Sequence, residues 1–403
     1  EDKAAAAAAA AKTGARAALA GRLTAGLASE FARWSAAIAG LKAREGTLAG
    51  DAALAAAFLA YAPPFPAGVR ADLVTRAWLP CLRAGVGGGG GEVSTTRLPL
   101  GPSPSPLDLL VDTRARAAWV AQGLGSDTQS LENGAIVVAA TGGVEELVGG
   151  GGDGGASAST SRPAGRRWPL LVDPQLQGAR WVAGRETGRG LVTLQQGDAR
   201  FAAALAEAAA AGSPVLVEAM PEEVSPVLEG LLAAGPGAAS RSAPAPSTVR
   251  IGEADVLVHP AFRLYLQTRL PSPHYMPEVA AQVSLVDCSI TRAGLEDQLL
   301  GRVVDAERPD LAAAAAGLAA QATSYAATLV GLEDDLLARL ASATGDILED
   351  GALVDGLEAT KATAAEVEAK AAAAAAAAAG IEAARAAYRP AASRGALLYL
   401  LVS

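Results

Sequence analysis

The sequence is poor in lysine, histidine, cysteine and aromatic residues. Only five of its 403 residues are lysines, and none of them lies between residues 43 and 360. There are two histidines and two cysteines, and 4% of the residues are aromatic. The cysteines, Cys81 and Cys288, are far apart in the sequence, which excludes a disulfide scaffold and is typical of a reducing compartment.

Positive charge is also scarce. Lysine and arginine total 33 against 42 acidic residues, so the formal net charge is −9, and the pI is near 5.0. Non-specific binding to nucleic acid or to an anionic membrane requires a basic face, so we expect neither partner. No purely apolar run, the alanine tract at 371–379 included, approaches the roughly 20 residues that span a bilayer.

The length allows two or three domains of about 150 residues each. The chain begins with Glu1 and Asp2, and its first methionine is Met220, so we expect an internal piece of a longer protein without a signal peptide. Tracts rich in glycine, proline or small polar residues predict low-complexity loops at 84–106, 149–165 and 233–247.

Residues 1–48 are expected to form one long helix, because apolar residues recur at steps of three and four along one face. These residues are Leu19, Leu23, Leu27, Phe31, Trp34, Ile38 and Leu41. Gly46 and Gly50 are expected to end the helix. A shorter helix is then expected at 52–61, before the prolines that start at Pro63.

The middle of the chain predicts alternating strands and helices. Strands are expected at 167–173, 191–194, 214–218, 262–270 and 283–290, with a hairpin at 248–259. A short helix is expected to follow the first strand, and others at 199–211, 222–232 and 294–305. Asp198 is expected to cap the 199–211 helix, and Gly212 to end it. This alternation predicts an α/β fold with a mostly parallel sheet and helices on both faces.

Two heptad patterns follow and predict an antiparallel helical hairpin. They are interrupted at 342–351, where the chain is expected to reverse. Many seam positions are alanine, which allows the helices to approach closely but buries little surface. The first seam is Leu311, Ala315, Leu318, Ala322, Tyr325, Leu329, Leu332 and Leu336; the second is Leu357, Thr360, Ala364, Val367, Ala371, Ala374, Ala378, Ile381 and Tyr388.

A parallel sheet of this kind suggests a phosphate-binding loop after its first strand, of the form GxxxxGK[ST]. That position instead carries Asp173, Pro174, Gln175, Leu176, Gln177 and Gly178. Proline has no N–H to offer a phosphate, aspartate has the wrong charge, and the region contains no lysine. The sequence therefore argues against ordinary ATP hydrolysis in this segment, and no bound cofactor is expected.

Other catalytic patterns are also missing. Glu218 ends an apolar strand, at the position where ATPases of the AAA+ class carry a catalytic carboxylate, but without a phosphate-binding lysine it is expected to be structural. His259 and His274 have no cysteine near them in sequence, and no metal site is expected. Trp168 and Trp181 flank the altered loop; either could fill the vacated pocket, although core packing is the simpler interpretation.

Seven segments, in matching order from the first quarter of the chain to its end, carry a family resemblance. They read RLTAGLASE (22–30), LENGAIV (131–137), RWPLLVDPQLQG (167–178), PSPHYMPEV (271–279), GLEDQLL (294–300), ERPDL (307–311) and YRPAASRGALLY (388–399). Together they resemble the dynein heavy chain, and specifically the fifth AAA+ module of its motor ring. The segment KATAAEV (361–367) resembles axonemal outer-arm chains.

The resemblance implies a P-loop-NTPase-like AAA+ sheet, an α-helical small subdomain and a coiled-coil hairpin. It assigns 1–48 to the returning helix of the stalk and 49–106 to a helical connector with a Gly/Pro-rich insertion. It assigns 107–305 to the large subdomain, 306–390 to the small subdomain with its buttress, and 391–403 to the start of the next module. The glycine-rich insertions and the alanine-rich arms depart from the family.

The function that the resemblance implies is a non-hydrolysing module that relays movement of an ATP-driven, microtubule-based motor from the ring through the buttress to the stalk. ATP and magnesium would bind other modules of the parent chain. The implied partners are neighbouring modules, the stalk, the microtubule through an absent stalk tip, and dynein intermediate and light chains. The implied location is the cytoskeleton, in an axoneme. Two alternatives remain open: a free-standing nucleotide enzyme with an unorthodox site, and a coiled-coil structural adaptor.

Overall fold

The computed structural model describes residues 2–84, 98–141, 167–236, 248–342 and 351–402. Most of the expected glycine-rich loops, and the turn expected between the two heptad helices, lie outside these ranges. The described residues form two compact units. We call residues 1–45 and 299–398 the arm unit, and residues 46–298 and 399–403 the sheet unit. Within the described ranges, no helix combines the length and the apolar character that crossing a bilayer requires.

The sheet unit is built on five parallel strands in the order β2-β3-β6-β1-β7. Their bounds are β1 Trp168–Val172, β2 Val192–Gln195, β3 Val215–Glu218, β6 Leu264–Thr268 and β7 Val283–Asp287. β4 (Thr248–Ile251) and β5 (Ala254–Leu257) form the expected antiparallel hairpin. The predicted parallel sheet is thus confirmed. β1 and β6 are buried at every residue, and strands that are buried on both faces give apolar runs in the sequence.

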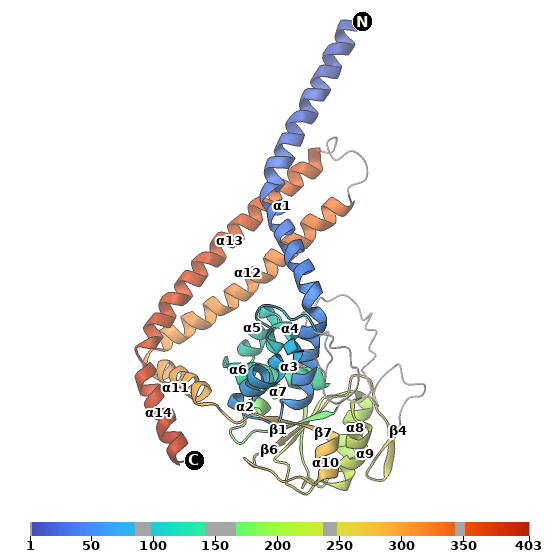
Figure 1. Cartoon of the computed structure of the whole chain (residues 1–403), viewed down its shortest axis with the longest axis vertical. Helices are drawn as coiled ribbons and strands as arrows, with labels where there is room; N and C mark the ends of the chain where they lie inside the picture. Colours follow the sequence, from blue (N-terminus) through green and yellow to red (C-terminus); the bar gives the residue numbers. More distant parts are fainter. Residues whose placement is uncertain (1, 85–97, 142–166, 237–247, 343–350, 403) are drawn as a thin grey trace. The chain divides into compact units, whose positions relative to one another are not determined.

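Helices cover both faces of the sheet, as predicted. One face packs against α1, α4 (Pro106–Leu110), α5 (Thr113–Ala121), α6 (Thr128–Thr141) and α7 (Gln177–Glu186). The other face packs against α8 (Phe201–Ala211), α9 (Pro226–Ala234) and the β4–β5 hairpin (Figure 1). α10 (Pro277–Gln282) also packs against this second core through Val279. Neighbouring residues of β1 separate accordingly, because successive side chains alternate between faces: Leu171 joins the first core and Leu170 the second.

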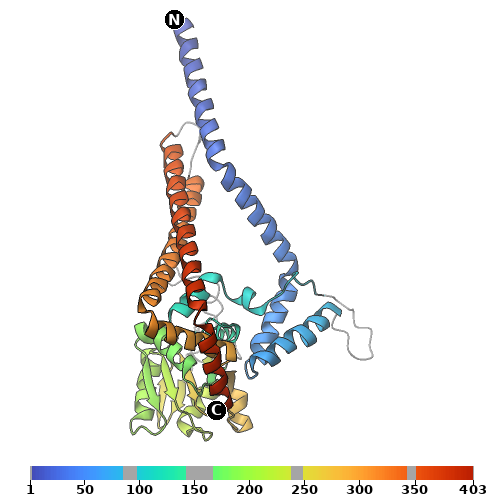
Figure 2. The same ribbon diagram turned by 90° about the vertical axis from the view of Figure 1, so that its left-hand side faces the viewer.

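The long first helix does not end where the sequence suggested. α1 runs from Asp2 to Tyr61 without a break, through both Gly46 and Gly50 (Figure 2). Gly50 is buried because another segment approaches it: an added Cβ would lie 2.2 Å from the carbonyl oxygen of Pro99. The glycine thus permits close approach, and a helix tolerates it at a cost of about 1 kcal/mol. Helices α2 (Ala67–Asp72) and α3 (Leu79–Ala84) follow, joined by a π-helical turn at Leu73–Trp78.

Two other local predictions were wrong. Asp198 does not cap α8, which begins at Phe201 without a side-chain cap; the Asp198 carboxylate instead accepts a hydrogen bond from the Gln195 backbone N–H at 2.8 Å. The helix expected at 222–232 begins only at Pro226, because Ser225 occupies the cap and Pro226 suits the first turn. Gly212 ends α8 in the left-handed conformation, at φ 82°, as predicted.

The arm unit contains the predicted antiparallel hairpin. α12 (Pro309–Ser342) and α13 (Gly351–Ala386) lie side by side in both views (Figures 1 and 2). All predicted seam residues are buried or half-buried except Ala322 and Ala378, which are exposed. Parts of α1, α11 (Arg292–Glu307) and α14 (Arg389–Val402) complete the unit, and Leu300, Val304 and Ala392 form a small core there.

Candidate functional site

The altered phosphate loop joins β1, an interior strand of the sheet, to α7. Set against GxxxxGK[ST], Asp173 occupies the first glycine position and Gly178 the second. Ala179 then stands where the motif requires lysine, and Arg180 where it requires serine or threonine. The two side chains that would contact phosphates and magnesium are therefore absent, while the strand–loop–helix geometry is retained.

The Asp173 carboxylate accepts hydrogen bonds from the backbone at the start of α7. Its Oδ1 accepts a hydrogen bond from the Gln177 backbone N–H at 2.9 Å, and its Oδ2 accepts one from the Ala179 backbone N–H at 2.9 Å. These amides belong to the first turn of α7, the kind of donors that hold phosphate in nucleotide-binding loops. Asp173 is fully buried; burial raises the pKa of its carboxyl, and the backbone donors around α7 oppose that shift. The protein thus supplies its own acceptor at this position.

The rest of the loop is shaped around that contact. Leu176 adopts a left-handed backbone at φ 60°, unusual for a residue with a branched side chain, and its side chain packs against the first core. Its backbone N–H donates to the Asp173 carbonyl oxygen at 3.3 Å, which closes the turn before α7. Pro174 and Gln175 are half-buried in this turn.

Glu218 lies at the same edge of the sheet as Asp173 but two strands away, because β6 separates β3 from β1. Gln267 on β6 bridges the two strands: its Nε2 donates to the Asp173 carbonyl oxygen at 3.0 Å, and its Oε1 accepts from the Ala219 N–H at 2.9 Å. Sequence reasoning missed Gln267, although a glutamine inside an otherwise apolar strand is a signal for such a role. The structure therefore links these strand ends through a fully buried amide.

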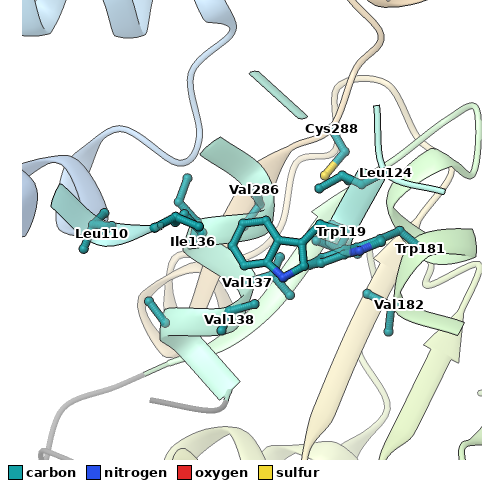
Figure 3. Packing of buried hydrophobic residues seen from close by; sticks show 14 of the residues in the cluster. Leu110, Trp119, Leu124, Ile136, Val137, Val138, Trp181, Val182, Val286 and Cys288 are labelled. Atoms are coloured by element: carbon teal, nitrogen blue, oxygen red, sulfur yellow. The ribbon is translucent and has the colours of Figure 1, made fainter. Parts of the chain in front are cut away.

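A small cavity lies beside the loop. Its volume of about 10 Å³ is too small for a nucleobase. Trp181 on α7 forms one wall and packs edge-to-face with Trp119 at 5.8 Å, next to Val137 and Cys288 (Figure 3). Trp181 thus packs in the first core, as the simpler interpretation predicted. Trp168 packs in the second core, on the opposite face of the sheet, where its Nε1 donates to the Leu231 carbonyl oxygen at 3.0 Å.

The base of α1 is tied to the sheet edge that carries the loop. The Asp287 carbonyl oxygen, at the end of β7, accepts hydrogen bonds from Gln129, Asn133 and Arg70, at 3.1, 2.8 and 3.3 Å. Arg70 also donates to the Pro63 carbonyl oxygen, which lies just after α1. Phe58, in the last turns of α1, is buried in the first core. Sequence analysis gave no sign of this attachment, because it depends on backbone carbonyls.

In the arm unit, α1 contacts both helices of the hairpin through ion pairs. The Arg22 guanidinium reaches Glu358 at 2.6 Å and Asp355 at 2.7 Å on α13, and Arg33 reaches Glu333 at 2.9 Å on α12. The Arg22 contact with Glu358 is bidentate, since Nε also donates to Oε1 at 3.0 Å. These partially exposed pairs join the first helix to the hairpin at two points.

In the part of the chain that the structure describes, each histidine side chain lies beside a polar neighbour. The His259 Nδ1 accepts from the Ala261 N–H at 3.1 Å, and the largely exposed His274 lies beside Glu222. Across the described ranges, no three histidine, cysteine or acidic side chains lie close enough together to hold a metal ion.

Comparison with known proteins gives two family matches. Residues 157–367 match the ATP-binding dynein motor region, and residues 1–82 match the microtubule-binding stalk of the dynein motor. The chain is 41% identical, over its whole length, to the dynein beta chain of the flagellar outer arm of Chlamydomonas reinhardtii. It is 38% identical, over 96% of its length, to dynein axonemal heavy chain 9 of Homo sapiens. It spans 8% of the length of each of these relatives.

Proposed function

The chain belongs to the dynein heavy-chain motor family, and we propose that it acts as a mechanical module of a microtubule-based, ATP-driven motor. In this role it carries movement from the motor ring to the stalk and performs no nucleotide chemistry itself. The observation that carries the proposal is the set of ion pairs by which α1, part of the segment that matches the stalk, contacts the α12–α13 hairpin.

The hairpin is the proposed lever. Arg22 and Arg33 lie eleven residues apart, about three helical turns, and contact opposite helices of the hairpin. A force on the hairpin is therefore applied to α1 at two points. The contacts are polar and partially exposed, so they can break and re-form without exposing a core. Such contacts suit a joint that must change during a cycle.

The exposed face of α1 supports the stalk assignment. Phe31, Ile38, Leu41 and Leu48 follow heptad spacing and are all more than half exposed. A stripe of this kind requires a helical partner, and we propose the outgoing helix of the same stalk, which lies outside this sequence. The stalk would then lead to the microtubule-binding tip.

The test of the lever uses charge exchange in an intact motor that contains this segment. Arg33→Glu and Arg22→Glu together should weaken the coupling between ATP binding and microtubule release. Arg33→Glu combined with Glu333→Arg should restore most of the coupling lost by Arg33→Glu alone, because the pair is rebuilt with its charges exchanged. Lys42→Glu, which makes the same charge change elsewhere on α1, is the control. Unchanged coupling in the Arg22→Glu, Arg33→Glu motor would refute the lever.

The second part of the proposal is that this module binds no nucleotide, because Asp173 already satisfies the amides at the start of α7. Calorimetric titration of the chain with ATP or inorganic pyrophosphate should show no saturable heat. A variant with Asp173→Gly, Ala179→Lys and Arg180→Thr restores the phosphate motif and should bind pyrophosphate. The Ala179→Lys, Arg180→Thr variant keeps Asp173 and should not. Saturable binding to the unaltered chain would contradict this part of the proposal.

The family also supports a proposal about location and partners. The relatives named above are flagellar and axonemal chains, so we propose that the parent motor works in an axoneme. Its neighbours would be the adjoining modules of the same heavy chain, with intermediate and light chains in the complex. Immunolocalisation of the tagged full-length protein tests the axonemal placement; staining confined to the cell body would contradict it.

A further inference from the structure

The cavity beside α7 has room for one small molecule. Its volume of about 10 Å³ corresponds to a single water molecule. The cavity lies between α6 and α7, under the end of β1, and its wall is mixed: Val137 and Leu171 are apolar, while Ser130, Asn133 and Gln177 are polar. A mixed wall of this kind differs from the purely apolar lining of cavities that stay dry.

Two buried polar atoms of residues that line the cavity have no hydrogen-bond partner among the residues that the structure describes. They are the Oδ1 of Asn133, whose side chain is 6% exposed, and the Nε1 of Trp181, which is 2% exposed. The orientation of the Asn133 amide follows from its other end, since Nδ2 donates to the Asp287 carbonyl oxygen at 2.8 Å. Leaving such groups unsatisfied is costly, and buried polar groups in folded proteins nearly always have a partner.

The chemistry of the two atoms defines the ligand. Asn133 Oδ1 needs a hydrogen-bond donor and Trp181 Nε1 needs an acceptor. A metal cation offers no acceptor to the indole N–H, and a fully ionised anion offers no donor to the amide oxygen. We propose that a single resident water molecule occupies this cavity, donates to Asn133 Oδ1 and accepts from Trp181 Nε1.

A third hydrogen bond is available on the same wall. Ser130 Oγ donates to Asp127 and accepts from Gln177 Nε2 at 3.0 Å, which leaves it a second lone pair for the water's other hydrogen. Three bonds is the usual number for a buried water. The water would join α6 to α7 next to Gly178, and this inference does not depend on the proposed motor function.

The test measures the water directly in the full chain. With ¹⁵N-labelled tryptophan, the Trp181 indole proton, identified by its loss in Trp181→Phe, should show a cross-relaxation peak to a long-lived water. A crystal structure at about 1.8 Å should show density within hydrogen-bond distance of both Asn133 Oδ1 and Trp181 Nε1. An empty cavity, or a direct protein partner for either atom, would overturn the proposal.

A matched pair of variants tests the proposal through the direction in which Tm changes. Val137→Ile extends a wall residue toward the cavity, whereas Val138→Ile makes the same change one residue later, at a buried position outside the wall. Val137→Ile should abolish the water peak and give a lower Tm than Val138→Ile, because displaced water leaves two polar groups without partners. A Tm above that of the unaltered chain would indicate that a dry cavity had been filled, and would overturn the proposal; so would a water peak that survives in Val137→Ile.

Discussion

The buried Glu186 carboxylate offers the sharpest test of what holds the sheet unit together. It lies at the end of α7 and is fully buried. Its Oε1 accepts from Tyr265 Oη at 2.8 Å and from Arg263 Nη1 at 3.1 Å, and its Oε2 lies 3.2 Å from Arg189 Nη1. Arg185 is 3.7 Å away and stacks over Trp181. One carboxylate therefore serves three guanidinium groups.

The perturbation is Glu186→Gln, which keeps the shape and removes the charge. The Arg263 and Arg185 side chains are only 10% and 11% exposed, so both would lose the charge of Glu186 while still largely buried. Breaking a buried ion pair in this way costs about 3–5 kcal/mol. The glutamine oxygen can still accept one of the hydrogen bonds, so we expect the lower end, about 3 kcal/mol.

Urea unfolding followed by tryptophan fluorescence measures this loss. In a Trp34→Phe background the remaining tryptophans all belong to the sheet unit, so the signal reports that unit alone. With a slope of about 3 kcal/mol per molar urea, the midpoint should fall by about 1 M. Glu222→Gln, the same change at a half-exposed carboxylate, is the control and should stay within about 0.5 kcal/mol. A midpoint for Glu186→Gln equal to that of the control would refute the reasoning.

The pH dependence has a definite sign. Burial raises the pKa of Glu186, but Arg263, Tyr265 and the other arginines outweigh it and leave the pKa below its ordinary value of 4.5. The unfolded state thus binds the proton more readily, so the contribution of Glu186 to stability is complete above about pH 4.5 and is lost as the pH falls further. The difference in free energy of unfolding between the unaltered chain and Glu186→Gln should therefore be full at pH 7 and shrink once the pH falls below about 4.5.

Two matched pairs of substitutions extend the tests to the helices. Gly50→Ala should destabilise the chain by more than about 1 kcal/mol, because the new Cβ would meet a backbone oxygen at 2.2 Å, whereas Gly46→Ala, which meets nothing within 4 Å, should raise thermal stability by up to about 1 kcal/mol. Equal effects measured by thermal denaturation would contradict the close approach at Gly50. Leu336 is a seam residue that is 2% exposed, and Leu336→Ala should lower the free energy of unfolding by about 2–5 kcal/mol, measured by urea unfolding followed by the helical circular-dichroism signal. Leu337 is 48% exposed, and Leu337→Ala should lower it by less than about 0.5 kcal/mol. Similar losses would contradict the hairpin seam.

The strands and the hairpin could be predicted because their signals are local. β1 is an unbroken apolar run buried on both faces, and the seams of α12 and α13 repeat every seven residues, so periodicity alone locates them. The strand order could not be predicted. An apolar run indicates that a strand is buried but not which strand lies beside it. The position of β6 between β3 and β1 is therefore visible only in the structure.

Gly46 and Gly50, which lie inside α1, show why helix ends are harder to predict. Glycine after an apolar stripe is the usual sign of a helix end, but the same residue is required where a second segment comes within contact distance of the backbone. The two cases differ only in the tertiary neighbour, here Pro99. The Asp198 error is of the same kind, because its carboxylate had a nearer backbone donor than the helix it was expected to cap.

The candidate site was predictable in its composition and not in its arrangement. The missing lysine and the misplaced charge of Asp173 are visible in the sequence, and both argue against a bound phosphate. The sequence could not reveal that this carboxylate accepts hydrogen bonds from the backbone at the start of α7. The amides at the start of α7 still need an acceptor when no phosphate is present, and the Asp173 carboxylate supplies one at 2.9 Å from two of them. Because Arg70 joins the end of β7, at the same edge, to the residues just after α1, we expect the closed loop and the base of α1 to form one rigid part of the sheet unit.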